Sequence, residues 1–404
     1  MPAAGLQRRC GLRRLALIFA AALVAAFVAR GHGASLSVET KTVPGLAPKT
    51  AIVAHTIRLT GLIEQGDADR LRKILAGLRA AKTAQPPPGS PLATIELSSK
   101  GGDYHEGLKL GYLFREFGVA TMVRSSDLCL SACALAFLGG TQGRVPAQIA
   151  TPSRSLEIGG QVGFHNFSLT SPADLSATSR DAREGVIRGF NEARGGAAGL
   201  VHYAAQMGID MTFVARMIGQ PIEVWEYVDT DEAFVTLGVC PVGLEKRPSN
   251  PAAVAANICN HATGGLVHAS PLQARSLSPR EARRRLLERV RDVADAVAAK
   301  GPMASQLAAV LASRDDALVE SVYVGLRSAG VPLPDILGMN YEVSGYNLGG
   351  SPVECHVSFA RSDPTKYDVA LSSPDGLLKP VQSAPAACPA VFLFDVDEVL
   401  NPRR

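Results

Sequence analysis

Two kinds of hydrophobic periodicity alternate over the first half of the chain. Residues 51–63 carry alternating and β-branched side chains, which predicts a strand, and residues 66–82 carry leucines and isoleucine at helical spacing. The same alternation then repeats, with a strand predicted at 91–102, a helix at 103–118 and another strand at 119–126. Strands that alternate with helices in this way indicate βαβ units and a largely parallel sheet.

The pattern changes after residue 248. A stretch rich in Ser, Pro and basic residues breaks the alternation, so we place a linker at 249–278. Residues 280–300 then have apolar side chains along one side of an amphipathic helix, within a helical region predicted for 279–338. Short segments of strand character predict a small β-rich module at 339–404.

The N-terminus has the pattern of a targeting segment, which we predict over residues 1–33. Four arginines precede an apolar run at residues 15–29. This run is shorter than the roughly 20 residues of a spanning helix. We therefore expect a cleaved secretory signal and a periplasmic or secreted protein, with the alternative that residues 15–29 remain as an anchor in the inner membrane.

Charge and cysteine content limit the chemistry of the chain. Its 404 residues include 41 basic and 37 acidic ones, and this near-neutral balance argues against a nucleic-acid partner. Six of the seven cysteines follow the apolar run, which predicts up to three disulfides in an oxidising compartment, unless several thiols are free and buried. Proximity in sequence favours the pairs Cys129–Cys133, Cys240–Cys259 and Cys355–Cys388. No cysteine or histidine spacing suggests zinc, so we predict no metal and no cofactor.

Three segments of the first block carry residues suited to nucleophilic catalysis. A turn at Gly101 and Gly102 lets the backbone approach a ligand closely and present its N–H groups. Ser131 lies where a helix is predicted to follow a strand, so that its hydroxyl and the Ala132 amide face the ligand crevice of an α/β sheet. His165 follows on a short strand, and an imidazole within hydrogen-bond reach can take the proton of a serine. The alternative is a small serine that lets a buried helix pack closely and a structural histidine.

Four segments in order resemble landmarks of the Clp-protease/crotonase fold. They are "LSSKGGDYHEGLKLG", "CLSACALAFLGG", "GQVGFHNFS" and "VDTDEAFVTLGV". Over residues 50–248 the chain is similar to the proteolytic subunit of the Clp protease and its extracytoplasmic relatives. The resemblance implies a βαβ spiral, a peptide or protein substrate, Ser131 as nucleophile, His165 as base, and an oxyanion hole built from the N–H groups of Ala132 and of Gly101 or Gly102. It also leaves a homo-oligomer open.

Two positions depart from the family pattern. Lys100 stands where the family has a proline before the paired glycines. The acid that would complete the triad falls on Trp225, whose indole cannot do the work of a carboxylate. Glu223, Glu226 or Asp229 can substitute, and we predict Glu226 because it is adjacent in register.

The sequence therefore predicts an exported serine hydrolase, most simply a peptidase that uses Ser131 and His165. The alternative, from a different class, is a non-catalytic binding or scaffold protein that keeps the Clp-like fold without a working triad.

Overall fold

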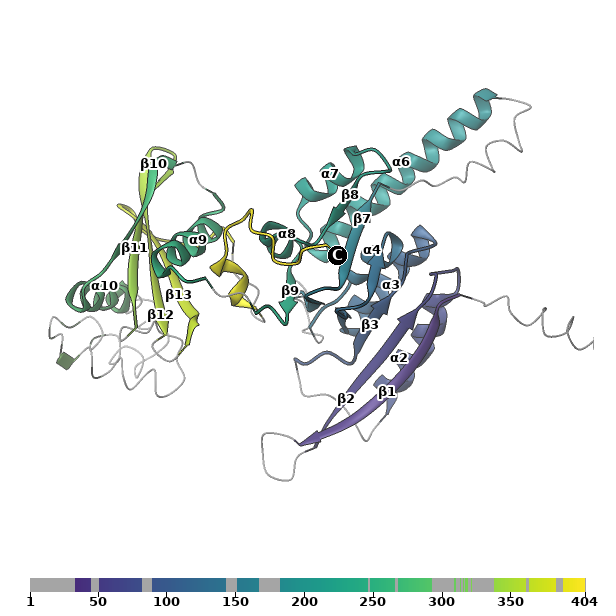
Figure 1. The fold of residues 1–404 in the computed structure, drawn as a ribbon, viewed down its shortest axis with the longest axis horizontal. Coiled ribbons are helices and arrows are strands. Elements are labelled where there is room, and N and C mark those ends of the chain that lie inside the picture. The colour runs from purple at the N-terminus through teal and green to yellow at the C-terminus, as the bar shows by residue number, and fades with distance from the viewer. Residues whose placement is uncertain are drawn as a thin grey trace, which may run out of the picture.

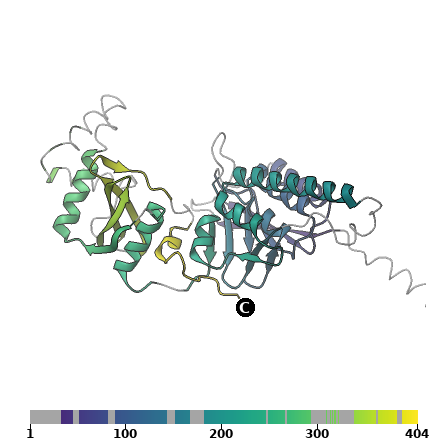
Figure 2. The same ribbon diagram turned by 90° about the horizontal axis from the view of Figure 1, so that it is seen from above.

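The computed structural model of the chain describes residues 33–44, 51–81, 89–142, 151–166, 182–245, 248–265, 268–292, 338–360, 363–382 and 388–403, with six single positions between 309 and 321. These residues form two lobes, which Figures 1 and 2 show from the side and from above. The predicted targeting segment at 1–33, with its anchor at 15–29, lies outside the described residues except for Gly33.

A six-stranded sheet runs through the first lobe in the order β1-β2-β3-β4-β6-β9. All neighbouring pairs are parallel except β1 and β2, which form an antiparallel hairpin. The strands are β1 (Ser35–Pro44), β2 (Ala51–Thr60), β3 (Thr94–Ser98), β4 (Ala120–Val123), β6 (Arg154–Glu157) and β9 (Val239–Val242). The parallel sheet confirms the mixed α/β prediction. β1 was not predicted, because this edge strand pairs through its backbone and has few apolar side chains.

Helices cover this sheet and connect its strands (Figure 1). They are α2 (Asp67–Ala80), α3 (Tyr104–Phe117), the short α4 (Ala132–Phe137), the long α6 (Ala182–Met207), α7 (Met211–Gly219) and α8 (Asp231–Thr236). α3 begins where the Asp103 side chain accepts a hydrogen bond from the Glu106 N–H, and it ends at Gly118 in the left-handed conformation.

Two glycines on α3 let neighbouring helices approach closely. A Cβ atom on Gly107 would lie 2.5 Å from the Ala132 carbonyl oxygen, and one on Gly111 would lie 1.8 Å from the Tyr203 hydroxyl. Neither clash can be relieved without moving a backbone or a buried ring. The spacing of four residues places both glycines on the same side of α3, where Gly107 admits the first turn of α4 and Gly111 admits the Tyr203 ring of α6.

A second, three-stranded sheet in the first lobe has the order β5-β7-β8. Its strands are β5 (Leu128–Leu130), β7 (Gln161–His165) and β8 (Trp225–Tyr227). β5 and β7 are parallel, whereas β7 and β8 are antiparallel, with His165 opposite Trp225 and Phe164 opposite Glu226. This small sheet places the end of β7 next to the turn between β5 and α4.

The second lobe is built on an antiparallel sheet of five strands in chain order. These are β10 (His268–Ser276), β11 (Asn340–Leu348), β12 (Ser351–Ala360), β13 (Asp363–Ser373) and β14 (Gly376–Leu378), accompanied by α9 (Pro251–Thr263) and α10 (Pro279–Asp292). The C-terminal antiparallel sheet agrees with the predicted β-rich module. Most of the predicted helical region at 279–338 beyond α10 lies outside the described residues.

The prediction of a linker at 249–278 is wrong for the residues of this stretch that the structure describes. The stretch contains α9, capped by Asn250 with Pro251 in its first turn, and the edge strand β10. Serine and proline in β10 suggested a linker. An edge strand tolerates both, because one row of its backbone groups needs no partner in the sheet.

Three disulfides join the six cysteines that follow the N-terminal segment. Cys129 pairs with Cys133 as predicted, but the other two bridges are Cys240–Cys388 and Cys259–Cys355. The predicted pairs Cys240–Cys259 and Cys355–Cys388 are therefore wrong. Cys259 lies on α9, which packs on the sheet that carries Cys355, so three-dimensional packing overrides proximity in sequence.

The C-terminal segment returns from the second lobe to the first (Figure 1). It passes through the 3₁₀ helix η1 (Pro389–Leu393), which follows Cys388. The segment then pairs with the chain between β8 and α8, where the Asp231 N–H donates to the Glu398 carbonyl at 2.9 Å and the Leu400 N–H donates to the Asp229 carbonyl at 2.8 Å. This C-terminal strap, residues 395–403, therefore lies next to the small sheet that carries His165.

Candidate active site

Ser131 lies on a strained turn between β5 and α4. Its φ of 55° and ψ of −122° make it the one non-glycine residue with positive φ among the described residues. Such a conformation costs on the order of 1–3 kcal/mol for a residue with a Cβ atom. The Ser131 N–H donates to the Gly163 carbonyl on β7 at 2.9 Å, which holds the turn against the strand that leads to His165. Strain of this kind at a half-buried serine is typical of a functional site.

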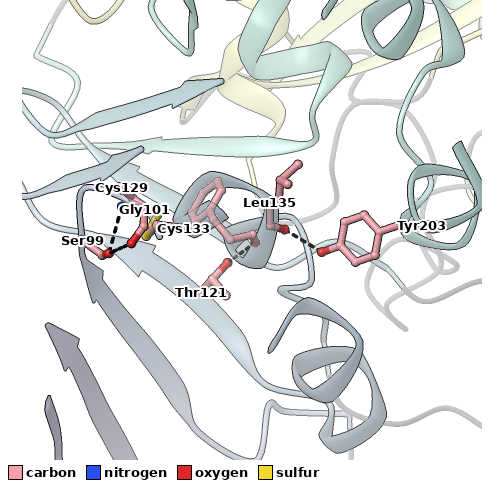
Figure 3. The surroundings of a disulfide bond; sticks show 8 residues. Ser99, Gly101, Thr121, Cys129, Cys133, Leu135 and Tyr203 are labelled. Carbon is pink, nitrogen blue, oxygen red and sulfur yellow. Dashed lines mark hydrogen bonds between the residues drawn. A yellow bond between two sulfur atoms is a disulfide. The ribbon is translucent and has the colours of Figure 1, made fainter. Parts of the chain in front are cut away.

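The turn between β5 and α4 is held by a disulfide, whose surroundings Figure 3 shows. The Cys129–Cys133 disulfide spans the turn, with 5.1 Å between the two Cα atoms. At the other end of α4, the Tyr203 hydroxyl donates to the Leu135 carbonyl at 2.6 Å and the Thr121 hydroxyl donates to the Phe137 carbonyl at 2.8 Å. These bonds add to the backbone hydrogen bonds that the same two carbonyls accept from the Leu138 and Gly140 N–H groups.

The imidazole of His165 meets the Ser131 hydroxyl. The distance from Nε2 to Oγ is 2.9 Å, which is within ordinary hydrogen-bond range. Burial lowers the pKa of His165, and the nearby backbone of Ile222 and Asn166 acts in the opposite direction. At neutral pH the ring is therefore uncharged, and Nε2 can accept the proton of the serine.

The other ring nitrogen of His165 has no acid beside it. Nδ1 is buried and has no hydrogen-bond partner among the described residues. The predicted third member, Glu226, instead pairs with Nε of Arg216 at 3.0 Å and accepts a hydrogen bond from the Gln220 amide at 2.5 Å.

The structure therefore does not bring Glu226 to the imidazole. Neighbouring residues of a strand point to opposite faces, and Trp225 is the residue opposite His165. The two other acids considered from the sequence do not supply the missing partner either. Glu223 is exposed, and the carboxylate of Asp229 pairs with Nε of Arg403 at 3.1 Å.

The glycine turn lies against Ser131. Gly101 and Gly102 have φ values of 106° and 140°, a region that favours glycine. A Cβ atom on Gly101 would lie 2.8 Å from the Ser131 Cβ, and one on Gly102 would lie 2.1 Å from the Ile63 carbonyl oxygen. Both positions therefore exclude any side chain.

The candidate oxyanion donors are not equivalent. The Gly101 N–H donates to the Ser99 hydroxyl at 3.1 Å, so it is already occupied. The Ala132 N–H is in the first turn of α4 and has no acceptor within the helix. Gly102 lines the same cavity as Ser131 and His165, and no acceptor for its N–H occurs among the described residues. Of the three predicted residues, Gly102 and Ala132 are thus the ones with an N–H left for a ligand.

The catalytic candidates open into a cavity of about 210 Å³. Apart from Gly102, Ser131 and His165, its walls are mostly apolar, and the Tyr104 ring also contributes. The apolar lining residues are Leu135, Phe164, Leu200, Met217 and Ile222. Sequence analysis missed the last three, which lie on α6, on α7 and just after α7, because nothing in an apolar helix face distinguishes cavity lining from ordinary core.

Within the part of the chain that the structure describes, no three His, Cys, Asp or Glu side chains are grouped to hold a metal ion. None of the helices described has both the length and the hydropathy needed to cross a bilayer.

Known proteins resemble the chain only in structure. No family model matches it, and no curated protein does. It is similar to a variant of the 1510-N membrane-bound stomatin-specific protease, at 12% identity and a TM-score of 0.28 over 42% of this chain and 70% of that one. It is also similar to ClpP1 from Listeria monocytogenes, at 14% identity and a TM-score of 0.31 over 48% of this chain and 92% of that one. A mutant of that ClpP1 gives 14% identity and a TM-score of 0.30 over 46% and 92%. The Clp-protease/crotonase spiral stays a prediction within the mixed α/β class.

Proposed function

We propose that the chain is a serine hydrolase that cleaves peptide bonds through Ser131 and His165. The observation that carries the proposal is the 2.9 Å contact between Nε2 of His165 and Oγ of Ser131, at a serine held in a strained conformation at the mouth of a cavity. A serine with a neutral imidazole within hydrogen-bond reach is a combination that activates the hydroxyl as a nucleophile. The cavity lining includes no Asp, Glu, Lys or Arg side chain, which suits an uncharged substrate side chain better than a charged group.

In the proposed reaction, the proton moves between three atoms. Nε2 of His165 takes the proton from Ser131 as Oγ bonds to the carbonyl carbon of the substrate. The N–H groups of Gly102 and Ala132 stabilise the resulting oxyanion, a contribution on the order of 3–4 kcal/mol for each donor. Nε2 then gives the proton to the departing amine, the C–N bond breaks, and water hydrolyses the acyl-serine with the same imidazole as base.

One observation favours the alternative of a binding or scaffold protein. With Nδ1 of His165 unpaired, no carboxylate orients the ring or stabilises its charged form. In enzymes that have such a carboxylate, its neutralisation lowers the rate by about 10⁴-fold.

A fluorophosphonate probe distinguishes the two functions. We expect it to label the folded chain, and we expect Ser131→Ala to abolish the labelling because the nucleophile is gone. The matched control is Ser126→Ala, an exposed serine near the same turn, which is expected to leave labelling unchanged. A folded chain that is never labelled, or is labelled equally after Ser131→Ala, supports the scaffold and refutes the hydrolase.

We also propose that the protein is exported and that its N-terminal segment is cleaved. Disulfides form and persist in oxidising compartments, and the chain has three. Mass spectrometry of protein from the periplasm or medium is expected to show a mature N-terminus after the apolar run and three disulfides. Recovery of the uncleaved chain from the membrane fraction points to the anchor at 15–29. A homo-oligomer stays a prediction.

A further inference from the structure

An aromatic ring occupies the place opposite His165 where a triad has its acid. His165 and Trp225 form a cross-strand pair between β7 and β8. Their ring centroids are 4.3 Å apart and the ring planes meet at 33°, so the indole covers a face of the imidazole. Cross-strand pairs of this kind fix each other's rotamers because both side chains stand on the same face of the sheet.

The indole is itself held in a longer stack. Tyr227, two residues further along β8, lies 6.0 Å from Trp225 with nearly parallel ring planes. The guanidinium of Arg403 lies 5.0 Å from the Tyr227 ring and also pairs with Asp229. Imidazole, indole and phenol rings are therefore stacked in that order, and a side chain of the C-terminal strap closes the far end.

No charged side chain contributes to the environment of the imidazole. The ionisable residues on the segments around it include Asp103, Tyr104, Arg216, Glu223, Glu226, Tyr227, Asp229 and Arg403. None of them is among the causes that shift the pKa of His165, which are burial and nearby backbone. Glu226 is neutralised by Arg216 on the other face of β8. Among the described side chains, Ser131 and the face of Trp225 contact the ring, and the backbone of Ile222 and Asn166 lies beside it.

We propose that Trp225 is the positioning residue of the base, in place of the missing carboxylate. Its ring holds the imidazole so that Nε2 faces Oγ of Ser131. When the serine proton moves to Nε2, the imidazolium lies against the electron-rich face of the indole, which attracts a cation. Trp225 exchanges no proton. This inference rests on the proposed hydrolase function for its catalytic part, whereas the contact between the two rings does not depend on it.

Two substitutions of Trp225 distinguish the effect of its aromatic face on His165 from the effect of excluding water. Trp225→Phe keeps an aromatic face, and Trp225→Leu keeps only apolar cover. We expect the fluorophosphonate labelling rate at neutral pH to fall by less than about 3-fold in Trp225→Phe and by roughly 10- to 30-fold in Trp225→Leu. The matched control is Glu226→Gln, which removes the neighbouring charge on the opposite face of β8 and is expected to change the rate by less than about 2-fold.

A second measurement tests the contact between His165 and Trp225, and it applies whether or not the chain is a hydrolase. NMR titration of full-length protein with ¹³C-labelled histidine gives the pKa of His165. The His165 signal is assigned as the one that disappears in His165→Ala. We expect its ring proton signals to be shifted upfield by the indole, and its pKa to be lower in Trp225→Leu than in Trp225→Phe, because the cation has lost its aromatic partner.

The outcomes separate the two proposals. Equal pKa values of His165 in the two Trp225 variants overturn the positioning role. Loss of labelling in a folded Glu226→Gln chain also overturns it, because that result would make Glu226 the acid. An unlabelled chain whose His165 still shows the ring shift and the expected pKa order refutes the hydrolase and leaves the contact between the rings standing.

Discussion

The C-terminal strap makes a specific prediction at Asn401, because this side chain connects the two strands around the site. Its Oδ1 accepts a hydrogen bond from the Gly159 N–H at 2.8 Å, and its Nδ2 donates to the Gly160 carbonyl at 2.8 Å. Nδ2 is also 3.5 Å from the carbonyl of Val228, directly after β8. Gly159 and Gly160 form the turn that begins β7. The side chain is buried, so water does not replace it when it is removed.

The cost of Asn401→Ala follows from these contacts. Two hydrogen bonds of good length are lost, and each leaves a partly or fully buried backbone group unpaired, at about 1–3 kcal/mol for each group. The 3.5 Å contact is at the limit of a hydrogen bond and adds little. Allowing for partial access of water to Gly159, we expect the free energy of unfolding to fall by about 2–3 kcal/mol. A domain of this size then melts roughly 4–12 °C lower.

The same change is expected to reach the candidate site. A loosened turn before β7 displaces His165 relative to Ser131, and a displacement near 1 Å can slow a reaction by about 10²-fold. Thermal unfolding and the rate of fluorophosphonate labelling measure the two effects on one sample. Val399→Ala is the matched control, because it shortens an exposed side chain of the same strap, so its effects are expected to be smaller. Unchanged melting and labelling in Asn401→Ala would refute the role given to the strap.

Three further predictions concern the glycine turn, the imidazole and a disulfide. Gly102→Ala is expected to slow labelling by on the order of 10²–10³-fold, because the new Cβ would lie 2.1 Å from the Ile63 carbonyl oxygen and displace an oxyanion donor. The control is Gly66→Ala, which is also at positive φ but in open space and is expected to leave the labelling rate unchanged. The labelling rate is expected to rise with pH to a plateau with a midpoint below 6.5, because burial lowers the pKa of His165 and its neutral form is the base; a midpoint above 7 contradicts this sign. Stability should change in the same direction, since a depressed histidine pKa destabilises the folded state as pH falls below the unfolded value of about 6.5. Replacing Cys259 and Cys355 together by alanine is expected to cost about 2–4 kcal/mol in denaturant unfolding, because the bridge closes a separation of 96 residues, and unchanged stability would show that the bridge is dispensable.

Local patterns predicted much of the first lobe, because they follow directly from side-chain periodicity. The expected strand at 51–63 and helix at 103–118 correspond to β2 and α3, and the glycine turn, Ser131 and His165 do meet. The third site member was not predictable by register alone. Residues 225 and 226 are adjacent in sequence, yet they stand on opposite faces of β8, and only the pairing with β7 decides which of them meets the imidazole.

Contacts between residues far apart in the chain could not be predicted from the sequence for a similar reason. The Cys240–Cys388 bridge spans 148 positions, and Asn401 joins a turn 242 residues earlier. No periodicity encodes such distances, because any of several apolar or polar segments satisfies the same local rules. Leu200, Met217 and Ile222 illustrate this for the cavity: each has an ordinary apolar side chain until α6 and α7 fold over Ser131.

The position of the strap at the end of the chain determines when the site can be completed during synthesis. The turn that begins the His165 strand receives its Asn401 partner only after the ribosome has added more than 230 further residues. At about 5–20 residues per second this takes on the order of 10–50 s. During that interval the nascent chain already carries Ser131 and its imidazole partner, but the strands around them lack their last support. Under the proposed hydrolase function, the site is therefore expected to become fully active only after the strap has been synthesised.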